Sequence, residues 1–451
     1  MNEKIFRLYD IRGKYPSQIN EKEVFDIGLN LREIFPKKGR IVIGRDARLS
    51  SPSLCMALEH GLCAAGFKVI NVGMITTPML DFAVKQLKAD GGVVVTASHN
   101  PKNDNGIGII DSSGLFIGGN EVFSKISKKN LKVKSDVGKL KNLKENQSIK
   151  RNLYQKYAEY LNKFFDVSKK LKIVIDCSDG SAGPIIKLIK FPKNIETIVI
   201  NSNPNGNFPA HGPDPTKKTA QKTISMAILR NKADLGVIFD GDSDRALFAD
   251  DKGRAVRPEH VWRILAIKEH KQTVVFTVLC KYIMDLIKNS SEIFRNFRFV
   301  EAKVGHLFMK KICRREKTVI GVESSTHYYF SEDNFSGSAI LAMIKVLNAV
   351  SQLPYRFSEL TGMLPNVFIF PEINLKFNRK NLYNSYLRAK RIFSKKSTKI
   401  YFLDGISAYG NDWWFNVRPS NTEDLVRINI ETKNKNKLQE IEKKLLKIFK
   451  K

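Results

Sequence analysis

The sequence predicts an α/β protein: three domains built on mixed or parallel sheets, then a smaller C-terminal α+β domain, around one central cleft. Short apolar strands alternate with amphipathic helical stretches in three successive rounds. Such β-α-β-α-β units form mostly parallel sheets covered by helices. After Pro354 the pattern changes to isolated strands and one lysine-rich terminal helix. A chain of 451 residues predicts about three domains, with two or four as the neighbouring counts.

Each round combines short apolar runs with longer stretches that carry apolar residues at helical spacing. We expect strands at 40–44, 68–72, 92–96, 172–176, 196–200, 235–239, 273–278, 299–302 and 318–321. We expect helices at 52–66, 78–88, 183–190, 216–231, 258–269 and 305–314, and one after Lys281. The isolated strands of the last part are expected at 366–370, 397–402, 412–417 and 425–431. With linkers near 133–150, 250–258 and 353–365, the expected domains are 1–150, 151–253, 254–362 and 363–451.

The composition is that of a globular protein with an unusually positive charge. A hydrophobic fraction of 42% argues against wholesale disorder, and 76 basic against 45 acidic residues give a net charge of +31. Such a field attracts nucleic acid, anionic membranes or phosphorylated metabolites, and composition does not choose among them. The basic residues are spread along the chain without a nucleic-acid-binding module, so a nucleic-acid binder is the least favoured class.

Cysteine usage and hydropathy indicate a cytoplasmic protein. The five cysteines are widely spread and form no Cys-x-x-Cys pair, which favours free thiols in a reducing compartment. The first residues lack the apolar segment of a signal peptide. No stretch reaches the roughly 18 consecutive apolar residues of a membrane-spanning helix. We therefore expect a soluble, cytoplasmic chain.

Each round also ends with polar residues just past an apolar strand, where open α/β sheets bind ligands. Three such loops suggest one cleft assembled between domains. The first loop, 96–101, carries Ser98 and His99, and a serine hydroxyl exposed there is available for covalent chemistry. From the residues alone, an ordinary turn in which Ser98 and Asn100 bond local backbone is favoured over that interpretation.

The second loop, 240–245, places three carboxylates at alternate positions: Asp240, Asp242 and Asp244. Glycine and serine between them allow the carboxylates to converge on one cation, and oxygen ligands suit Mg²⁺. Without a cation the three charges would repel one another, which argues against a merely solvated turn. The loop is not a calcium helix-loop-helix, because loop position 12 is Asp251 rather than glutamate.

Two further segments suit a phosphorylated sugar. The first offers a guanidinium, hydroxyls and an amide, a donor set typical of a phosphate cradle, although a turn between strands fits equally well. Its donors are Arg418, Ser420, Asn421 and Thr422. In the second, Glu323, Ser325 and His327 alternate, so in an extended segment they would point the same way toward sugar hydroxyls. An exposed polar edge has the same pattern.

In this order, the four motifs resemble those of the α-D-phosphohexomutases, particularly the phosphomannomutase/phosphoglucomutase branch. The resemblance covers nearly the whole chain and includes 6–13 (FRLYDIRG), 44–52 (GRDARLSSP), 207–209 (NFP), 213–215 (PDP) and 303–306 (KVGH). It implies four domains around a central cleft. It also implies an enzyme that reversibly shifts phosphate between O1 and O6 of mannose and/or glucose, through a phosphoserine and a hexose 1,6-bisphosphate intermediate.

The resemblance also implies roles for single residues. Ser98 is the implied phosphoserine, and Asp240, Asp242 and Asp244 are the implied Mg²⁺ ligands together with a phosphoserine oxygen. The other implied catalytic residues are His99, Arg12, Arg245 and His306. The implied substrate-binding residues are Tyr9, Lys303, Glu323, Ser325, His327, Arg418, Ser420, Asn421 and Thr422. The implied activator is a hexose 1,6-bisphosphate and the partner a phosphorylated hexose, with neither nucleic acid nor membrane, and the chain is expected to be a monomer or weak dimer.

The sequence departs from the family pattern in two places. Gly108 stands where the family has a lysine that is usually taken as a general acid/base, and Lys102 or Arg12 are the candidates to replace it. The sugar loop, usually Gly-Glu-Met-Ser-Gly-His, reads VESSTH at 322–327, so Val322 and Thr326 replace glycines. Gly108 and Thr326 leave open a catalytically weakened paralogue that binds phosphosugars. Within the family, a phosphoglucosamine mutase is the less favoured alternative, because residues 7–13 (RLYDIRG) resemble the mannose/glucose branch.

Overall fold

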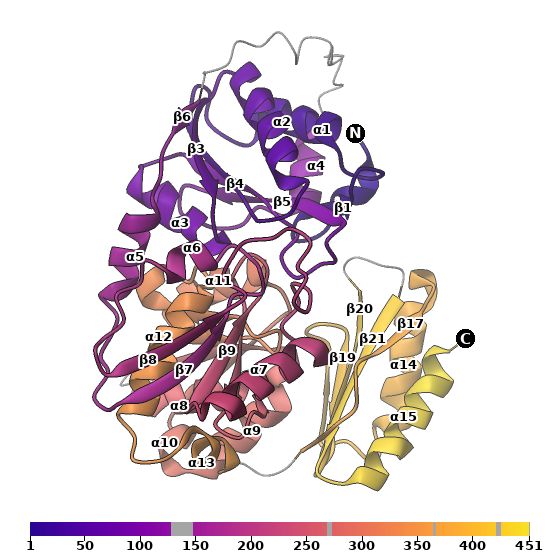
Figure 1. Ribbon diagram of the computed structural model, residues 1–451. Helices are drawn as coiled ribbons and strands as arrows, with labels where there is room; N and C mark the ends of the chain where they lie inside the picture. Colours follow the sequence, from indigo (N-terminus) through magenta and orange to yellow (C-terminus); the bar gives the residue numbers. More distant parts are fainter. Residues whose placement is uncertain (128–147, 268–272, 364–366, 421–424, 451) are drawn as a thin grey trace.

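The computed structural model describes residues 1–127, 148–267, 273–363, 367–420 and 425–450. Four sheets follow one another along this part of the chain, each with its own helices (Figure 1). We refer to them as units I to IV, which hold strands β1–β6, β7–β11, β12–β15 and β16–β21. Units I to III have mixed sheets between helices, and the sheet of unit IV is antiparallel. The predicted fold class is confirmed.

Unit I contains a six-stranded sheet in the order β1-β5-β4-β2-β3-β6, in which β5 alone runs antiparallel to the other strands. Its strands are β1 (Ile11–Lys14), β2 (Arg40–Arg45), β3 (Lys68–Met74), β4 (Gly91–Val95), β5 (Asp104–Asp111) and β6 (Ile149–Lys150). Its helices are α1 (Glu21–Asn30), α2 (Ser51–Ala64), α3 (Thr77–Gln86) and α4 (Gly119–Ser127). Helix α3 begins at Thr76, whose side chain accepts from the Met79 N–H, with a proline in the first turn.

Unit II has the strand order β11-β10-β9-β7-β8, with β9, β7 and β8 parallel. Its strands are β7 (Leu171–Asp176), β8 (Ile195–Ile200), β9 (Leu235–Phe239), β10 (Ala246–Asp250) and β11 (Ala255–Val256). Its helices are α5 (Tyr154–Asn162), α6 (Gly183–Ile186) and α7 (Lys218–Asn231). Strand β9 is buried along its whole length, as its uninterrupted apolar sequence requires.

Unit III has the strand order β13-β12-β14-β15, parallel except for β15. Its strands are β12 (Thr273–Thr277), β13 (Arg298–Ala302), β14 (Ile320–Val322) and β15 (Tyr328–Phe330). Its helices are α8 (Pro258–Ala266), α9 (Lys281–Ser290), α10 (Glu292–Arg295), α11 (His306–Arg315), α12 (Ala339–Ser351) and α13 (Phe357–Gly362). The side chain of Ser338 caps α12 by accepting from the Leu341 N–H.

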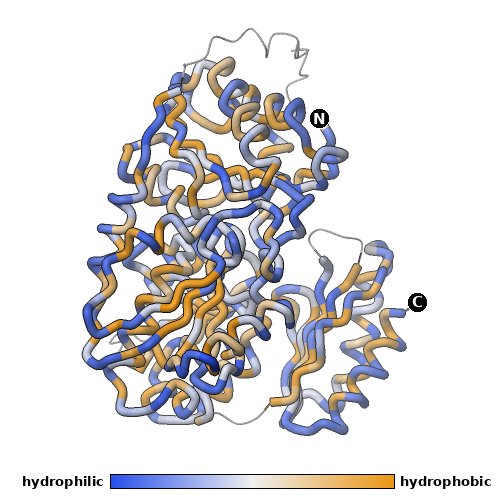
Figure 2. The backbone as a smooth tube through the Cα atoms, in the orientation of Figure 1, coloured by the Kyte–Doolittle hydropathy of each residue, from blue (hydrophilic) through white to orange (hydrophobic). Residues whose placement is uncertain are grey.

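Unit IV packs two outer helices, α14 (Leu382–Phe393) and α15 (Lys435–Phe449), against one face of its sheet (Figure 1). The strands are β16 (Phe368–Ile369), β17 (Ile373–Lys376), β18 (Lys399–Tyr401), β19 (Ile406–Tyr409), β20 (Trp413–Pro419) and β21 (Leu425–Thr432). Figure 2 shows the hydrophilic outer sides of these helices and the hydrophobic strands at the centre of unit II.

One apolar core runs through units I to III, and unit IV has its own. A smaller cluster joins the two parts: Val278, Leu279 and Tyr282 of unit III pack with Tyr409 and Trp414 of unit IV. The burial of these aromatic rings stabilises the orientation of unit IV against unit III. In the described part of the chain, no helix is long and apolar enough to span a membrane.

The structure differs from the sequence-based prediction mainly in its antiparallel strands and in several helices. Strand β5 contains Asn105, Gly106 and Gly108, which are typical of turns, and β15 is only three residues long. The expected linker at 250–258 is instead a hairpin from β10 to β11. Helix α12 was not predicted, because it is apolar on nearly all sides and buried, and therefore lacks an amphipathic pattern. The other helices that were missed are α1, α4, α5, α10, α13 and α14.

Candidate functional site

All four units line a single cleft of about 1040 Å³. The loops that follow the carboxyl ends of β4, β9 and β14 meet there with β20 and β21 of unit IV. Of the residues predicted from the sequence, those that line the cleft are Tyr9, Arg12, Ser98, His99, Asp242, Asp244, Arg245, His306, Glu323, Ser325, His327 and Arg418. The loops of three separate sheets therefore converge as their positions after strands predicted.

Ser98 lies at the centre of this arrangement, on the loop between β4 and β5. Its Oγ donates to Asp240 Oδ2 over 2.8 Å and lies 3.2 Å from Nδ1 of His99. The backbone of Ser98 has φ +49°, a left-handed conformation that non-glycine residues rarely adopt outside functional sites. Burial, with the charges of Arg245 and Arg12, holds the pKa of His99 well below its usual range, so His99 is neutral near pH 7.

A buried arginine, Arg48, holds the serine loop in this conformation. Its guanidinium donates to the carbonyl oxygens of Ser98, Asn100, Pro101 and Asp104 at 2.6–3.0 Å. Its Nε lies 3.0 Å from a carboxylate oxygen of Asp46. No role was assigned to this pair from the sequence. The signal that could have found it is an Asp-x-Arg sequence directly after the buried strand β2.

The three aspartates of the loop after β9 are close together. Oxygen atoms of Asp240, Asp242 and Asp244 all lie within 4.8 Å of one another. The loop is fixed from both sides: the Thr77 hydroxyl donates to Asp242 Oδ2 over 2.6 Å, and the Ala246 N–H donates to the Thr326 carbonyl over 3.0 Å. Hydrogen bonds to units I and III therefore hold the three carboxylates close together.

The electrostatics of this cluster fit a bound cation. Burial and the neighbouring carboxylates raise the pKa of Asp240 well above its ordinary value and that of Asp242 to about 6. Oδ1 of Asp242 is buried and has no hydrogen-bond partner among the described residues. A divalent cation would compensate these charges and use the remaining oxygen, and an all-oxygen ligand set suits Mg²⁺. The residues present therefore fit a metal ion.

Glu323, Ser325 and His327 do come together, but the extended segment expected for them is wrong. Residues 323–327 form the tight turn of the β14–β15 hairpin, with the Thr326 N–H bonded to the Glu323 carbonyl. The turn leaves Nδ1 of His327 2.9 Å from Glu323 Oε2 and 2.8 Å from the Ser325 hydroxyl. The pairing of the two strands across the turn, rather than alternation along one strand, gathers the three side chains.

His327 also connects the 323–327 turn to the aspartates, because its Nε2 lies 3.2 Å from Asp244 Oδ1. Burial lowers the pKa of His327, but Asp244 and Glu323 outweigh burial and raise the pKa to about 9. In the same way, burial raises the pKa of Asp244, while His327 and Arg245 hold it well below the usual range. The pair is thus a buried ion pair at neutral pH.

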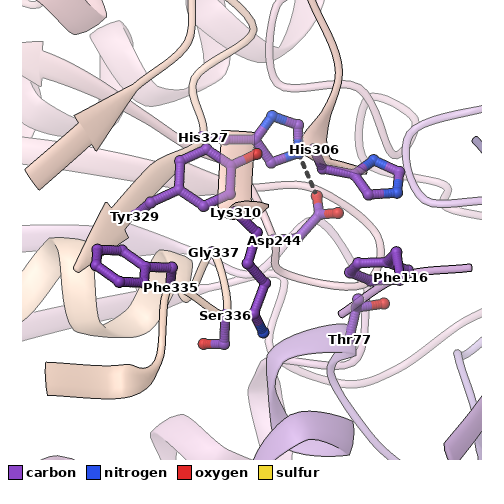
Figure 3. Close-up of a pocket in the computed structure, with 10 residues that line it drawn as sticks. All are labelled: Thr77, Phe116, Asp244, His306, Lys310, His327, Tyr329, Phe335, Ser336 and Gly337. Atoms are coloured by element: carbon purple, nitrogen blue, oxygen red, sulfur yellow. Dashed lines mark ion pairs between the residues drawn. The ribbon is translucent and has the colours of Figure 1, made fainter. Parts of the chain in front are cut away.

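A small cavity of about 10 Å³ is lined by this ion pair and shares lining residues with the cleft. Figure 3 shows His327 and His306 above Asp244, with Phe116 and Thr77 on the right of the view and Tyr329 and Phe335 on the left. The His306 ring packs edge-on against Phe116, and burial lowers its pKa. The cavity is large enough for about one water molecule.

The other predicted residues fall into three groups. Tyr9 donates from its hydroxyl to the Val304 carbonyl over 2.5 Å, and Arg12 pairs with Asp10 at 2.6 Å and donates to Asn100. Lys303 is exposed, with its ammonium over the Phe308 ring, and Ser420 is buried; neither is among the cleft-lining residues. Asn421 and Thr422 lie outside the described residues.

Several cleft-lining residues were not predicted from the sequence: Arg7, Arg257, Glu259, Glu372, Arg427, Asn429 and Glu431. Arg427 and Asn429 alternate on β21 and so share one face of the strand, but a solvent-exposed face has the same alternation, so the sequence does not single them out. Gly108 also lines the cleft, where the resemblance implies a lysine. The ammonium of Lys102 instead lies 3.4 Å from Asn207 Oδ1, and Lys102 is not among the cleft-lining residues.

Comparisons with known proteins agree along the whole chain. Residues 3–136, 155–253 and 260–368 match alpha/beta/alpha domains I, II and III of phosphoglucomutase/phosphomannomutase, and residues 372–448 match the C-terminal domain. The chain is 32% identical to a phosphomannomutase of Methanocaldococcus jannaschii over 98% of both chains. It is also 32% identical to a phosphomannomutase of Escherichia coli K12, over 95% of this chain and 94% of the relative.

A solved structure shows the same architecture. The crystal structure of a phosphoglucomutase/phosphomannomutase family protein from Burkholderia thailandensis superposes with a TM-score of 0.83 at 25% sequence identity. The superposition covers 99% of this chain and 98% of that one. The similarity thus includes all four units and their order around the cleft.

Proposed function

Because the chain belongs to the phosphoglucomutase/phosphomannomutase family, we propose that it reversibly moves phosphate between O1 and O6 of a hexose phosphate. The observation that carries the proposal is the position of Ser98. Its hydroxyl bonds to one aspartate of the buried triad and faces a cleft that all four units line. A serine so placed is suited to carry the phosphoryl group that leaves and returns to the sugar.

The proposed transfer begins from a phosphoserine at position 98. The bond between phosphorus and the serine oxygen breaks as a free hydroxyl of the hexose phosphate attacks, and the proton of that hydroxyl passes to the released oxygen of Ser98. The product is a hexose 1,6-bisphosphate, which turns around in the cleft. Its other phosphate then returns to Ser98, and the newly freed sugar oxygen takes up a proton. In this scheme a hexose 1,6-bisphosphate also acts as activator, because it phosphorylates free Ser98.

Basic and neutral donors around Ser98 supply the electrostatics of such a transfer. Arg245 lies 3.8 Å from both Asp240 and Asp244, close enough to neutralise charge on an adjacent phosphoryl group. Asp240, Asp242 and Asp244 would hold Mg²⁺, which when bound stabilises negative charge on the transferring phosphoryl group. His99, neutral and next to Ser98 Oγ, is placed to accept or return a proton there.

The remaining contacts suit the sugar and its second phosphate. Glu323 and Ser325 line the cleft from the same turn as His327, whose Nδ1 lies beside Glu323. They offer acceptors and a donor to ring hydroxyls. Arg418 lies across the cleft in unit IV and is suited to hold the phosphate that is not being transferred. Binding energy from this distal phosphate supports the reaction at the other end of the sugar. Mannose and glucose phosphates are both proposed substrates, by likeness to relatives named phosphomannomutase and to the phosphoglucomutase/phosphomannomutase family.

A second candidate function has one observation in its favour. Gly108 leaves the cleft without the lysine that the resemblance implies, and Lys102 does not line the cleft to replace it. A phosphosugar-binding protein with weak mutase activity would have this feature. It would also retain a Ser98 that accepts a phosphate, so rate rather than binding distinguishes the two candidates.

Intact-mass spectrometry after incubation with glucose 1,6-bisphosphate and Mg²⁺ tests the proposed phosphoserine. We expect the wild-type chain to gain one phosphate and Ser98→Ala to gain none. Ser112→Ala, at an exposed serine in the turn after β5, is the matched control and should gain one phosphate like the wild type. Phosphorylation of Ser98→Ala, or an unmodified wild type, contradicts the proposal.

A further inference from the structure

Glu372 occupies a position in the cleft between two arginines of unit IV. Its Oε1 lies 3.3 Å from Nη1 of Arg427, and its Oε2 accepts from Nδ2 of Asn429 over 3.2 Å and lies 3.9 Å from Nη2 of Arg418. Arg418 on β20 and Arg427 on β21 are directly opposite one another in the sheet. All four residues line the cleft. The carboxylate therefore has two guanidinium groups and one amide as its neighbours.

This arrangement is that of an anion site filled by the protein itself. Two arginines and a neutral amide donor are a set that binds phosphate, and a carboxylate is the anion that most resembles one among side chains. The site is open to solvent on one side, since the Glu372 and Arg427 side chains are 29% and 30% exposed while Arg418 is 6% exposed. Nε of Arg418 is buried with no hydrogen-bond partner among the described residues, so Arg418 retains a donor that Glu372 does not use.

We propose that Glu372 stands in for the non-transferring phosphate in the free protein, and that Arg427 and Asn429 hold this phosphate together with Arg418. The identity of the ligand as a phosphorylated hexose rests on the proposed function; the anion site rests on the contacts above. An arriving phosphate displaces the carboxylate from the arginines. The phosphate carries more charge and more acceptor oxygens than the carboxylate, so the arginines bind the phosphate more strongly than they bind Glu372.

The exchange has a consequence for the reaction. Without a competing anion, the two arginines would bind the hexose bisphosphate tightly. The bisphosphate must leave these arginines to turn around in the cleft. Glu372 compensates the arginines whenever the phosphate departs, so it lowers the affinity for both phosphates of the intermediate alike. It thereby favours turnover over retention, since tight uniform binding does not accelerate a reaction.

Equilibrium titration calorimetry with glucose 6-phosphate tests the proposal, using chains that carry Ser98→Ala so that no transfer takes place. With Glu372→Gln we expect the Kd to fall by roughly three- to tenfold, because the competing charge is gone, and the gain to shrink at high salt. Arg427→Met should raise the Kd. Glu442→Gln, on the outer helix α15, makes the same change in net charge away from the cleft and should leave the Kd unchanged.

A Kd that is unchanged or higher in Glu372→Gln overturns the proposal, because the carboxylate would then serve to orient the arginines rather than to occupy their site. Glu372→Ala, with its melting temperature measured beside the wild type, separates this result from a loss of folding. The outcome is independent of mutase activity. Mutase activity is measured separately, on the chain that retains Ser98. Tighter binding by Glu372→Gln together with an inactive Ser98 chain would reject the proposed function and keep the anion site, and an active Ser98 chain with unchanged binding by Glu372→Gln would do the reverse.

Discussion

Arg48 Nη2 donates to the carbonyl oxygen of Ser98 over 2.7 Å, and through this bond a residue outside the cleft lining determines where the serine hydroxyl lies. The same guanidinium binds three other carbonyls of the loop, and it is buried beside Asp46. One charged side chain thus maintains the left-handed conformation of Ser98. The position of the hydroxyl and the stability of unit I are consequently linked.

Arg48→Met should destabilise the protein by about 3–5 kcal/mol, because it leaves Asp46 buried without its cation and four carbonyls without a donor. Arg48→Lys retains the charge but not the planar fork, so we expect it to recover part of the stability and little of the Ser98 phosphorylation. Urea unfolding and intact mass measure the two effects. Arg32→Met, at an exposed arginine of unit I, is the control, and equal losses in both variants would contradict the account.

Thr326→Gly should stabilise the protein by about 0.5–1 kcal/mol. Thr326 has φ +69°, which is a strained conformation for a β-branched residue, and its buried hydroxyl has no hydrogen-bond partner among the described residues. Removing the strained backbone conformation and the unpaired hydroxyl stabilises the folded protein by more than glycine's greater entropy stabilises the unfolded chain. Thermal unfolding measures the change. Thr326→Val removes the hydroxyl and keeps the strain, so a Thr326→Gly protein no more stable than Thr326→Val would refute the strain argument.

Gly108→Lys should raise mutase turnover, by roughly tenfold or more, if a missing acid/base limits the rate. Gly108 lies in β5, and an added Cβ would meet Phe116 Cε1 at 3.5 Å and Val94 Cγ1 at 3.2 Å, so the Val94 side chain must shift by a few tenths of an ångström to admit the lysine. Lys102→Ala is the comparison and should leave turnover unchanged, since Lys102 reaches Asn207. A fast wild type that is indifferent to both changes means that other groups, such as His99, carry the proton.

The serine loop and the aspartate loop could be predicted from the sequence because each follows directly on a buried apolar strand. Glu323, Ser325 and His327 remain predicted substrate-binding residues, and the structure gathers them in a hairpin turn rather than along an extended segment. The turn was not predicted, since the three-residue strand β15 gave no pattern of its own. Glu372, Arg427 and Arg257 were not predicted, because their contacts join segments far apart in the chain. A charged residue on a strand has the same sequence pattern whether it faces solvent or a cleft.

Glu431→Gln should make the protein more stable at pH 8, by about 1–3 kcal/mol. Burial and the charge of Glu259 raise the pKa of Glu431 to about 7, although Arg257 lowers it. The pKa of Glu259 is instead lowered, because two nitrogen atoms of Arg257 bond to its carboxylate and only one bonds to Glu431. One arginine does not fully compensate two buried carboxylates.

The pH dependence of this effect has a defined sign. The folded protein binds the Glu431 proton more tightly than the unfolded chain does, so the wild type loses stability as pH rises from about 4.5 to about 7. Glu431→Gln should therefore match the wild type at pH 4 and exceed it at pH 8, as urea unfolding measures. Curves that run parallel over this range would contradict the assignment to Glu431.

Asp242→Asn should weaken Mg²⁺ binding. The Mg²⁺ concentration needed for half-maximal Ser98 phosphorylation should rise by roughly tenfold or more. The substitution removes one charge and one of the oxygen ligands from the triad. Asp26→Asn, at a carboxylate of α1 that pairs with Lys22, is the control with the same charge change. Undiminished phosphorylation of the wild type in excess chelator would exclude a role for the triad as a metal site.

The central claim, that this cleft moves phosphate within one hexose, is tested most directly by ³¹P NMR of mannose 1-phosphate and glucose 1-phosphate incubated with the protein. The samples contain Mg²⁺ and a catalytic amount of the matching hexose 1,6-bisphosphate. We expect the 1-phosphate signal of at least one substrate to be replaced by its 6-phosphate signal, and no conversion with Ser98→Ala. Release of inorganic phosphate alone, or two unchanged spectra, would contradict the claim.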